Sequence, residues 1–235
     1  MTDAAASSAA PSNEDLSRDE GRSGAEDPHF GSAPQMRSAR IRPVRPGDEQ
    51  ALADVCVRTG DAGGDATGRY SSDALLPSIF VLPYVAHHPD FAWVVETADD
   101  RVVGYIVGAP DTDAFDAWFR DEWWPAHGVL PKPGAPVTEE DDIIADAYRR
   151  GAEPSEGGRN GYPAHLHIDL LPEVQGQGLG RRVIDTLMER FRDAGVPGVH
   201  LVASARNAGA AAFYPRVGFT SVPSDAGILV YVRRL

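Results

Sequence analysis

The 235-residue chain has very little cysteine and lysine, with Cys56 and Lys132 as the single example of each. One cysteine excludes an intramolecular disulfide framework and a zinc site built from several thiolates. No apolar run approaches the roughly 20 residues of a membrane span, and the N-terminus lacks the basic-then-apolar pattern of a secretory signal. We therefore expect a cytoplasmic protein with no membrane partner.

Positive charge is also scarce, since 22 basic residues face 35 acidic ones and give a net charge of −13. A nucleic-acid backbone would be repelled by this field, which argues against nucleic acid as a main partner. A cationic or amine-bearing substrate suits the field better. The apolar fraction of 42% and the length are sufficient for one sizeable globular domain.

Two regions differ in composition. Residues 1–38 consist mainly of Ala, Ser, Pro, Gly, Asp and Glu and show no apolar periodicity, so we expect a disordered N-terminal tail. Residues 39–235 alternate strand-like and helix-like patterns, which predicts a single α/β domain with a mixed sheet and a helical insertion at about 111–160.

Hydrophobic periodicity predicts the elements of this domain. Cys56 falls on the apolar stripe of the first helix and is interpreted as a packing residue. The strands are expected at 39–44, 91–96, 102–108, 165–171, 199–203, 219–222 and 228–232. The helices are expected after Pro46, at 75–86 with a break near Pro83, at 113–126, at 139–150, after the glycine loop at 174–182, and from Asn207.

The glycine loop Val174-Gln-Gly-Gln-Gly-Leu-Gly-Arg-Arg lies between a strand and an amphipathic helix. Its glycines let the backbone approach a ligand, and its N–H groups, the helix N-terminus and Arg181 and Arg182 suit a phosphate or pyrophosphate. A P-loop would need Gly-Lys-Ser/Thr where the two arginines stand. A dinucleotide fingerprint would need its third glycine one residue later and an acid on the next strand, where His200 stands instead. A plain strand-to-helix turn is the remaining alternative.

The loop contains Gln175-x-x-Gly178-x-Gly180, and a second motif, Asn207-Ala-Gly-Ala-Ala-Ala-Phe-Tyr-Pro-Arg-Val-Gly-Phe, follows the next strand. With these two motifs, residues from about 39 to 235 resemble the GNAT superfamily of N-acetyltransferases. The segments 59–68, 108–112, 122–125 and 165–171 look most like bacterial relatives of the acetyltransferase-like C-terminal domain of eukaryotic O-GlcNAc hydrolases. The resemblance implies a mixed, mostly antiparallel central sheet with a splayed strand pair and flanking helices, and acetyl-CoA as co-substrate.

The resemblance also implies which residues hold acetyl-CoA. The strand before the loop would pair with pantetheine, the loop would hold the pyrophosphate, and Tyr214 would protonate the departing thiolate. On a simpler interpretation, Tyr214 is a core aromatic residue and Asn207 is only a helix N-cap. The expected cofactor-binding residues are Leu170, Leu171, Gln175, Gly176, Gln177, Gly178, Leu179, Gly180, Arg181, Asn207 and Tyr214.

The general base is expected on the strand that ends at Leu171. His165, His167 and Asp169 alternate along it and therefore project to one face. We expect His167 and Asp169 to act as a base relay, because histidine accepts protons near neutral pH and a carboxylate beside it would raise its pKa. Arylalkylamine N-acetyltransferases carry a similar His-x-His. A His-x-His metal site is a rival, although no third ligand is evident, and so are purely structural histidines.

The expected function is therefore transfer of acetyl from acetyl-CoA to a primary amine, either a small amine or a lysine side chain, by direct attack. A related fold that binds acetyl-CoA, or nothing, without catalysis is the alternative. An acidic, aromatic acceptor groove would attract a protonated amine, although the tryptophans could equally pack the insertion onto the sheet. The candidate acceptor residues are Asp61, Asp65, Tyr84, Asp111, Trp123 and Trp124.

Overall fold

The computed structural model describes residues 39–128, 139–149 and 161–235. The expected tail and two stretches of the expected insertion lie outside these residues. The described residues belong to one compact unit, and in this part of the chain no helix is long and apolar enough to cross a membrane.

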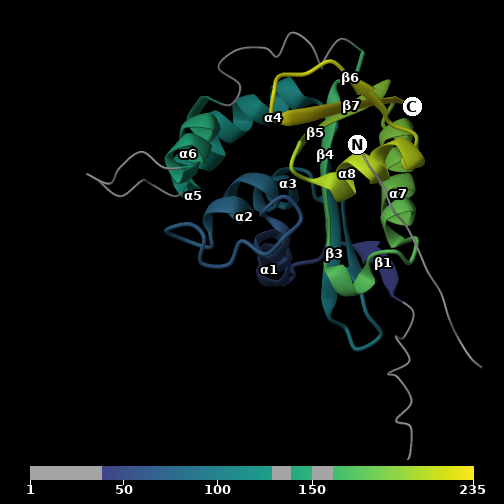
Figure 1. The fold of residues 1–235 in the computed structure, drawn as a ribbon, viewed down its shortest axis with the longest axis horizontal. Coiled ribbons are helices and arrows are strands. Elements are labelled where there is room, and N and C mark those ends of the chain that lie inside the picture. The colour runs from purple at the N-terminus through teal and green to yellow at the C-terminus, as the bar shows by residue number, and fades with distance from the viewer. Residues whose placement is uncertain (1–38, 129–138, 150–160) are drawn as a thin grey trace, which may run out of the picture. The chain divides into compact units, whose positions relative to one another are not determined.

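A seven-stranded sheet in the order β1-β2-β3-β4-β5-β7-β6 forms the centre of the fold (Figure 1). Neighbouring strands are antiparallel except β4 and β5, which are parallel. The expected mostly antiparallel α/β sheet is therefore confirmed. The strands are β1 (Arg40–Pro43), β2 (Ala92–Glu96), β3 (Val102–Ala109), β4 (Ala164–Leu170), β5 (Gly198–Ser204), β6 (Thr220–Val222) and β7 (Ile228–Arg234).

The sheet opens between its parallel strands. β4 and β5 pair only through Ala164–Val199 and His165–His200. β4 nevertheless stays paired with β3 as far as Gly104–Leu170, and β5 stays paired with β7 along its whole length. The two strands therefore diverge beyond His165, and this divergence is the splayed pair that the resemblance implied.

The helices follow the expected pattern with one local difference. The expected break in the 75–86 helix is present and lies at Val81, whose φ of −138° is not helical. The 113–126 helix contains a π-helical turn at Phe119–Trp123. The helices are α1 (Glu49–Thr59), α2 (Leu75–Phe80), α3 (Leu82–His87), α4 (Thr112–Trp118), α5 (Trp124–His127), α6 (Glu139–Arg149), α7 (Leu179–Asp193) and α8 (Ala208–Phe213), with 3₁₀ turns at Pro89–Phe91, Pro172–Val174 and Tyr214–Val217.

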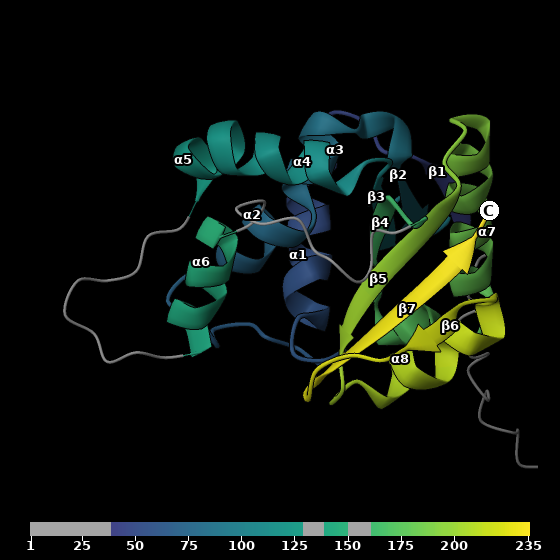
Figure 2. The same cartoon turned by 90° about the horizontal axis from the view of Figure 1, so that it is seen from above.

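Helices cover both faces of the sheet. In Figure 2, α7 lies on one side of the sheet, and the helices α1, α2, α4, α5 and α6 lie on the other. The apolar stripe of α7 packs so closely that a Cβ atom on Gly108 of β3 would lie 2.7 Å from Phe191. Because side chains alternate along a strand, Leu166, Ile168 and Leu170 face α7, and His167 and Asp169 face α1–α3. This second face is where the functional candidates gather.

Candidate active site

A cleft of about 210 Å³ lies where β4 and β5 diverge. It is bounded by the C-terminal end of α1 and the loop after it, by α2, by both strands and by the α8 segment. His167, Asp169, Asn207 and Tyr214 all line it. Four residues that the sequence singled out, from two distant segments, therefore meet at one place.

Backbone groups of β4 point into this opening. The Leu171 N–H donates to the Val103 carbonyl at 2.9 Å, and in an antiparallel pair such hydrogen-bonded positions alternate. Asp169 and His167 therefore direct their peptide groups to β3, whereas Ile168 and Leu170 direct theirs away from it, toward the diverging β5. The Leu170 carbonyl accepts a hydrogen bond from Gln175 Nε2 at 2.8 Å.

Leu171 differs from the other residues expected to bind the cofactor. Its N–H is already paired with Val103, and its side chain is 1% exposed. That side chain borders a different cavity. The alternation along β4 places the backbone groups facing the opening at Ile168 and Leu170 instead.

The glycine loop offers exposed backbone beside open space. Gly176 and Gly178 have φ values of +74° and +76°, and a Cβ atom on either would meet nothing within 4 Å. Gly178 is the N-cap of α7, so the first N–H groups of a 15-residue helix begin here. This geometry fits a phosphate-bearing ligand.

Side chains of the loop anchor it to the rest of the fold. Gln177 donates to the Glu173 carbonyl at 2.9 Å, and Arg181 donates to the Arg216 carbonyl. The side chain of Leu179 is buried in the core. A Cβ on Gly180 would lie 3.0 Å from Phe213 of α8, so the N-terminus of α7 packs against the segment that carries Tyr214.

Asp169 is a half-buried carboxyl group whose pKa is raised to about 6, because burial disfavours its charged form. A hydrogen bond from the Tyr105 hydroxyl stabilises the carboxylate and partly opposes this shift in pKa. A carboxyl group that titrates near neutral pH can both accept and release a proton in a reaction.

Tyr214 stands at the other wall of the cleft, in the 3₁₀ turn after α8. Its ring packs against Phe219 and Tyr231 at centroid distances of 5.6 and 5.2 Å. Burial raises the pKa of its hydroxyl, and the charge of Asp169 raises it further. The hydroxyl is therefore protonated at neutral pH and can act as a proton donor. Tyr214 is thus both a core aromatic and a cleft residue.

Asn207 is the N-cap of α8, with its side-chain oxygen accepting from the Ala210 N–H at 2.9 Å. It also lies beside Gly63, because a Cβ there would be 3.4 Å from Asn207 Nδ2. In the same loop Asp61 forms ion pairs with Arg69 and Arg206, at 3.0 and 3.1 Å. The loop after α1 is therefore tied to the start of α8 at the rim of the cleft.

The two histidines of β4 belong to a chain of polar groups. His167 Nε2 lies 3.0 Å from the Tyr84 hydroxyl, which lies 2.6 Å from His165 Nε2. His165 Nδ1 lies 2.7 Å from the Thr112 hydroxyl, which donates to the Pro163 carbonyl at 2.7 Å. Tyr84, named from the sequence only as a candidate acceptor residue, is fully buried. No local pattern connects it to His167, because the two are 83 residues apart.

Trp123 and Trp124, the two tryptophans named as candidate acceptor residues, pack against neighbouring elements of the fold. Trp123 donates from its indole to the Ser78 carbonyl at 2.8 Å and stacks on His127. Trp124 is buried and stacks on Phe119.

Two of the acidic candidates make local backbone bonds. Asp111 caps α4, and Asp65 accepts from the Thr67 N–H. Among the residues that the structure describes, no group of three His, Cys, Asp or Glu side chains is placed to hold a metal ion.

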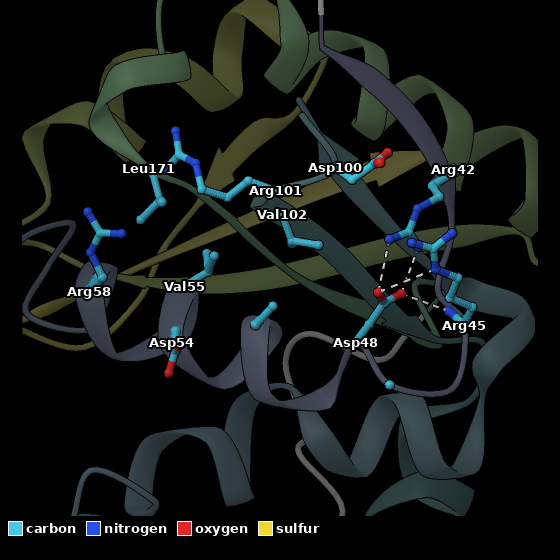
Figure 3. Close-up of a pocket in the computed structure, with 12 residues that line it drawn as sticks. Arg42, Arg45, Asp48, Asp54, Val55, Arg58, Asp100, Arg101, Val102 and Leu171 are labelled. Carbon is cyan, nitrogen blue, oxygen red and sulfur yellow. Dashed lines mark hydrogen bonds and ion pairs between the residues drawn. The ribbon is translucent and has the colours of Figure 1, made fainter. Parts of the chain in front are cut away.

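A second cavity, of about 390 Å³, lies along the other side of α1 (Figure 3). Arg42 lines this cavity and forms ion pairs with Asp48 and Glu96, at 2.7 Å each. These ion pairs connect β1 with β2 and with the start of α1. Of the residues predicted for catalysis or cofactor binding, Leu171 alone lines this cavity. The smaller cleft is therefore the candidate active site.

Comparison with known proteins agrees with this geometry. Residues 65–219 match the acetyltransferase (GNAT) family. The crystal structure of SsHAT superimposes with a TM-score of 0.76 at 37% identity, over 84% of this chain and 98% of that one. The PaiA N-acetyltransferase of Thermoplasma acidophilum, solved with coenzyme A, shares the fold at a TM-score of 0.52 and 14% identity, over 84% of this chain and 99% of that one.

A curated relative, the mycothiol acetyltransferase of Nocardiopsis dassonvillei, is 41% identical over 58 residues. That match spans 25% of this chain and only 18% of the relative's length. The family match covers well over half of the present chain, and the sheet shows the divergence of β4 and β5 that the resemblance implied. The chain therefore belongs to the GNAT family of acetyltransferases.

Proposed function

We propose that the protein is an acetyl-CoA-dependent N-acetyltransferase that acts in the cytoplasm and acetylates a primary amine by direct attack. The carrying observation is the divergence of β4 from β5 beside Asp169 and Tyr214. Within the family, the resemblance to bacterial relatives of the acetyltransferase-like domain of O-GlcNAc hydrolases supports a finer placement, which rests on sequence alone.

The proposed cofactor site combines the loop with the opened strand. The N–H groups from Gly176 to Gly180 and the α7 N-terminus would hold the pyrophosphate, where positive φ values and open space leave room for it. The peptide groups of Ile168 and Leu170 would pair with the pantetheine arm. Asn207, at the rim of the same cleft, would add an amide contact.

Acid–base groups flank the proposed reaction centre. Acetyl-CoA supplies the electrophilic thioester carbon. Asp169 and His167 would take the proton from the ammonium form of the acceptor, and Tyr214 would donate one to the departing sulfur. The Ile168 N–H, directed into the opening, would stabilise negative charge on the carbonyl oxygen.

The lining of the cleft indicates the class of acceptor. Among the described residues that line it, Asp169 is the one charged side chain. Several of the other lining residues are small, including Ala62 and Gly63. A slender protonated amine, either free or at the end of a lysine side chain, fits this combination of one anionic group and little bulk.

The test is a screen of monoamines, diamines and a lysine-containing peptide with acetyl-CoA. Free thiol is measured as CoA is released, and the acetylated product is identified by mass spectrometry. We expect turnover with at least one amine and its loss in Asp169→Asn. Calorimetry showing no acetyl-CoA binding would refute the proposal. Binding without turnover of any amine would instead favour the non-catalytic alternative.

A further inference from the structure

We propose that Tyr84, His165 and Thr112 are positioning residues that hold His167 in a single tautomer, with its basic lone pair on Nδ1. The role of this lone pair as a proton acceptor in catalysis rests on the proposed function, whereas the tautomer of His167 does not depend on it. The chain of four side chains thereby selects which atom of His167 can accept a proton.

The direction of every hydrogen bond among these side chains follows from the Pro163 carbonyl, the last group in the series. The Pro163 carbonyl can only accept, so the Thr112 hydroxyl uses its single proton there. Thr112 must then accept from His165, whose Nδ1 therefore carries hydrogen. A neutral His165 has its lone pair on Nε2 and accepts from the Tyr84 hydroxyl.

The same reasoning extends to His167. With its proton given to His165, the Tyr84 oxygen acts as acceptor toward His167 Nε2, 3.0 Å away. His167 Nε2 is therefore the protonated nitrogen, and Nδ1 of the neutral ring carries the lone pair. In the other tautomer of His167, the lone pair of Nε2 would face the accepting oxygen of Tyr84, and no proton would lie between the two atoms.

Packing keeps the chain in place. Tyr84 is fully buried and stacks on Phe115 at a centroid distance of 4.3 Å. Its ring stands edge-on to His165 and to His167, at 5.3 and 5.2 Å. Phe80 of α2 contacts the His167 ring from another side, at 5.4 Å. The hydroxyl of Tyr84 thus has little freedom to leave the two histidines.

The hydrogen-bonded series ends at the Pro163 carbonyl, which cannot pass a proton onward. The series therefore sets the orientation of His167 and does not conduct protons out of the site. A proton accepted by His167 would stay beside the cleft, because charge on the buried His165 would be costly. Titratable groups near these four side chains include Asp169 on β4, Tyr105 on β3, Tyr214 after α8 and His200 on β5. His87 and His88 contact Phe115, which stacks on Tyr84. His200 lies 5.8 Å from His165 and is hydrogen-bonded to the Tyr162 carbonyl.

The tautomer can be read directly, without substrate, by nitrogen NMR on the full-length protein labelled with ¹⁵N-histidine. His167→Gln assigns the His167 signals among the seven histidines. We expect hydrogen on Nε2 of His167 and on Nδ1 of His165 at pH values where both rings are neutral. Hydrogen on Nδ1 of His167, or a mixture of tautomers in the wild-type protein, would overturn the proposal.

Variants separate positioning from folding. Tyr84→Phe keeps the ring stack and removes the hydroxyl, so His167 should become a tautomer mixture, with kcat lowered about tenfold at an unchanged KM for acetyl-CoA. Thr112→Val should release the tautomer of His165, and Thr112→Ser should restore it. Thr186→Val, on α7, is the matched control.

A wild-type tautomer pattern in Tyr84→Phe would refute the positioning role. A fixed tautomer in the wild-type protein without any acetyltransferase activity would refute only the proposed function.

Discussion

Asp169 shows at the scale of one residue how the proposed chemistry opposes stability. Its carboxyl group has a pKa of about 6 in the fold against an ordinary value of 3.8, because it is desolvated. The folded state therefore holds the proton more tightly than the unfolded chain does. The free energy of unfolding decreases as pH rises from about 4 to above 6, where the folded carboxyl ionises.

Asp169→Asn should consequently stabilise the protein while abolishing turnover. Asparagine can still accept from Tyr105 and cannot ionise. We expect a gain of at most about 3 kcal/mol at pH 7.5, from some two pKa units at 1.4 kcal/mol each. The gain should vanish near pH 4. Chemical denaturation across this pH range, with the exposed Asp54→Asn as control, measures it. An equal effect of Asp169→Asn at every pH would contradict the expectation.

Tyr214 can be tested against a neighbouring tyrosine of similar burial. Tyr214→Phe removes the proposed proton donor but keeps the packed ring, so we expect kcat to decrease at least about tenfold with unchanged affinity for acetyl-CoA. Tyr231→Phe changes a ring 5.2 Å away that does not line the cleft, and it should have little effect. Steady-state and single-turnover rates of the two variants measure these effects. An unchanged single-turnover rate in Tyr214→Phe would show that Tyr214 is not the proton donor.

At the scale of elements, one buried carboxylate joins the first strand to the sheet. Glu96 of β2 has a side chain with no exposure and contacts Arg40, Arg42 and Arg45. The Arg42 hydrogen bond is the largest reason that the pKa of Glu96 is lowered to about 2. This contribution to stability is present above pH 4.5, the ordinary pKa, and is lost as pH falls toward 2.

Glu96→Gln should therefore cost about 3 kcal/mol of unfolding free energy at pH 7, because it leaves Arg42 without one of its two buried partners. The difference from wild type should shrink as the pH is lowered below 4.5. Urea denaturation measures both effects, and Glu189→Gln on the exposed side of α7 is the control. A loss no larger than that of the control would show that the network contributes little.

The two ends of α7 offer a matched pair of glycines, Gly178 before the helix and Gly195 after it. Gly178 and Gly195 both have positive φ, +76° and +73°, and open space at the Cβ position. Gly178→Val and Gly195→Val should therefore impose similar backbone strain. Only Gly178→Val should abolish acetyl-CoA binding in calorimetry. Equal loss of binding in the two variants would mean that strain, and not contact with the phosphates, is responsible.

The elements that could be predicted from sequence are those with short-range causes. The glycine loop, the Asn207 cap and the amphipathic α7 each depend on residues a few positions apart. The contact of Tyr84 with His167 could not be predicted, because it depends on how α3 packs on β4. The sequence could not distinguish Leu170 from Leu171 as the residue whose peptide groups face the opening, because this depends on how the strand pairs with β3.

On the scale of the whole molecule, the net charge of −13 affects the two proposed substrates in opposite ways. It attracts a protonated amine and repels acetyl-CoA. Binding of the anionic substrate must therefore depend on local donors, which the loop backbone and the α7 N-terminus can supply.

Removal of residues 1–38 should leave both the melting temperature and the acetyl-CoA affinity unchanged. Their composition offers no apolar periodicity with which to dock, and among the described residues the first strand of the sheet begins at Arg40. Thermal unfolding and calorimetry of a 39–235 variant beside the full chain test this. A fall of several degrees would show that the segment contributes to the fold.

The divergence of β4 and β5 gives the sheet two strand edges in its interior. Sheets ordinarily expose unpaired peptide groups only at their outer strands, where these groups can pair with strands of other chains. Here peptide groups that are not paired with a neighbouring strand also occur in the middle of the sheet. They lie next to Val202, which is 55% exposed. A ligand arm carrying amides would fill this gap as an added strand does. The ligand would then be part of the architecture, and the empty protein would be the form most prone to self-association on storage.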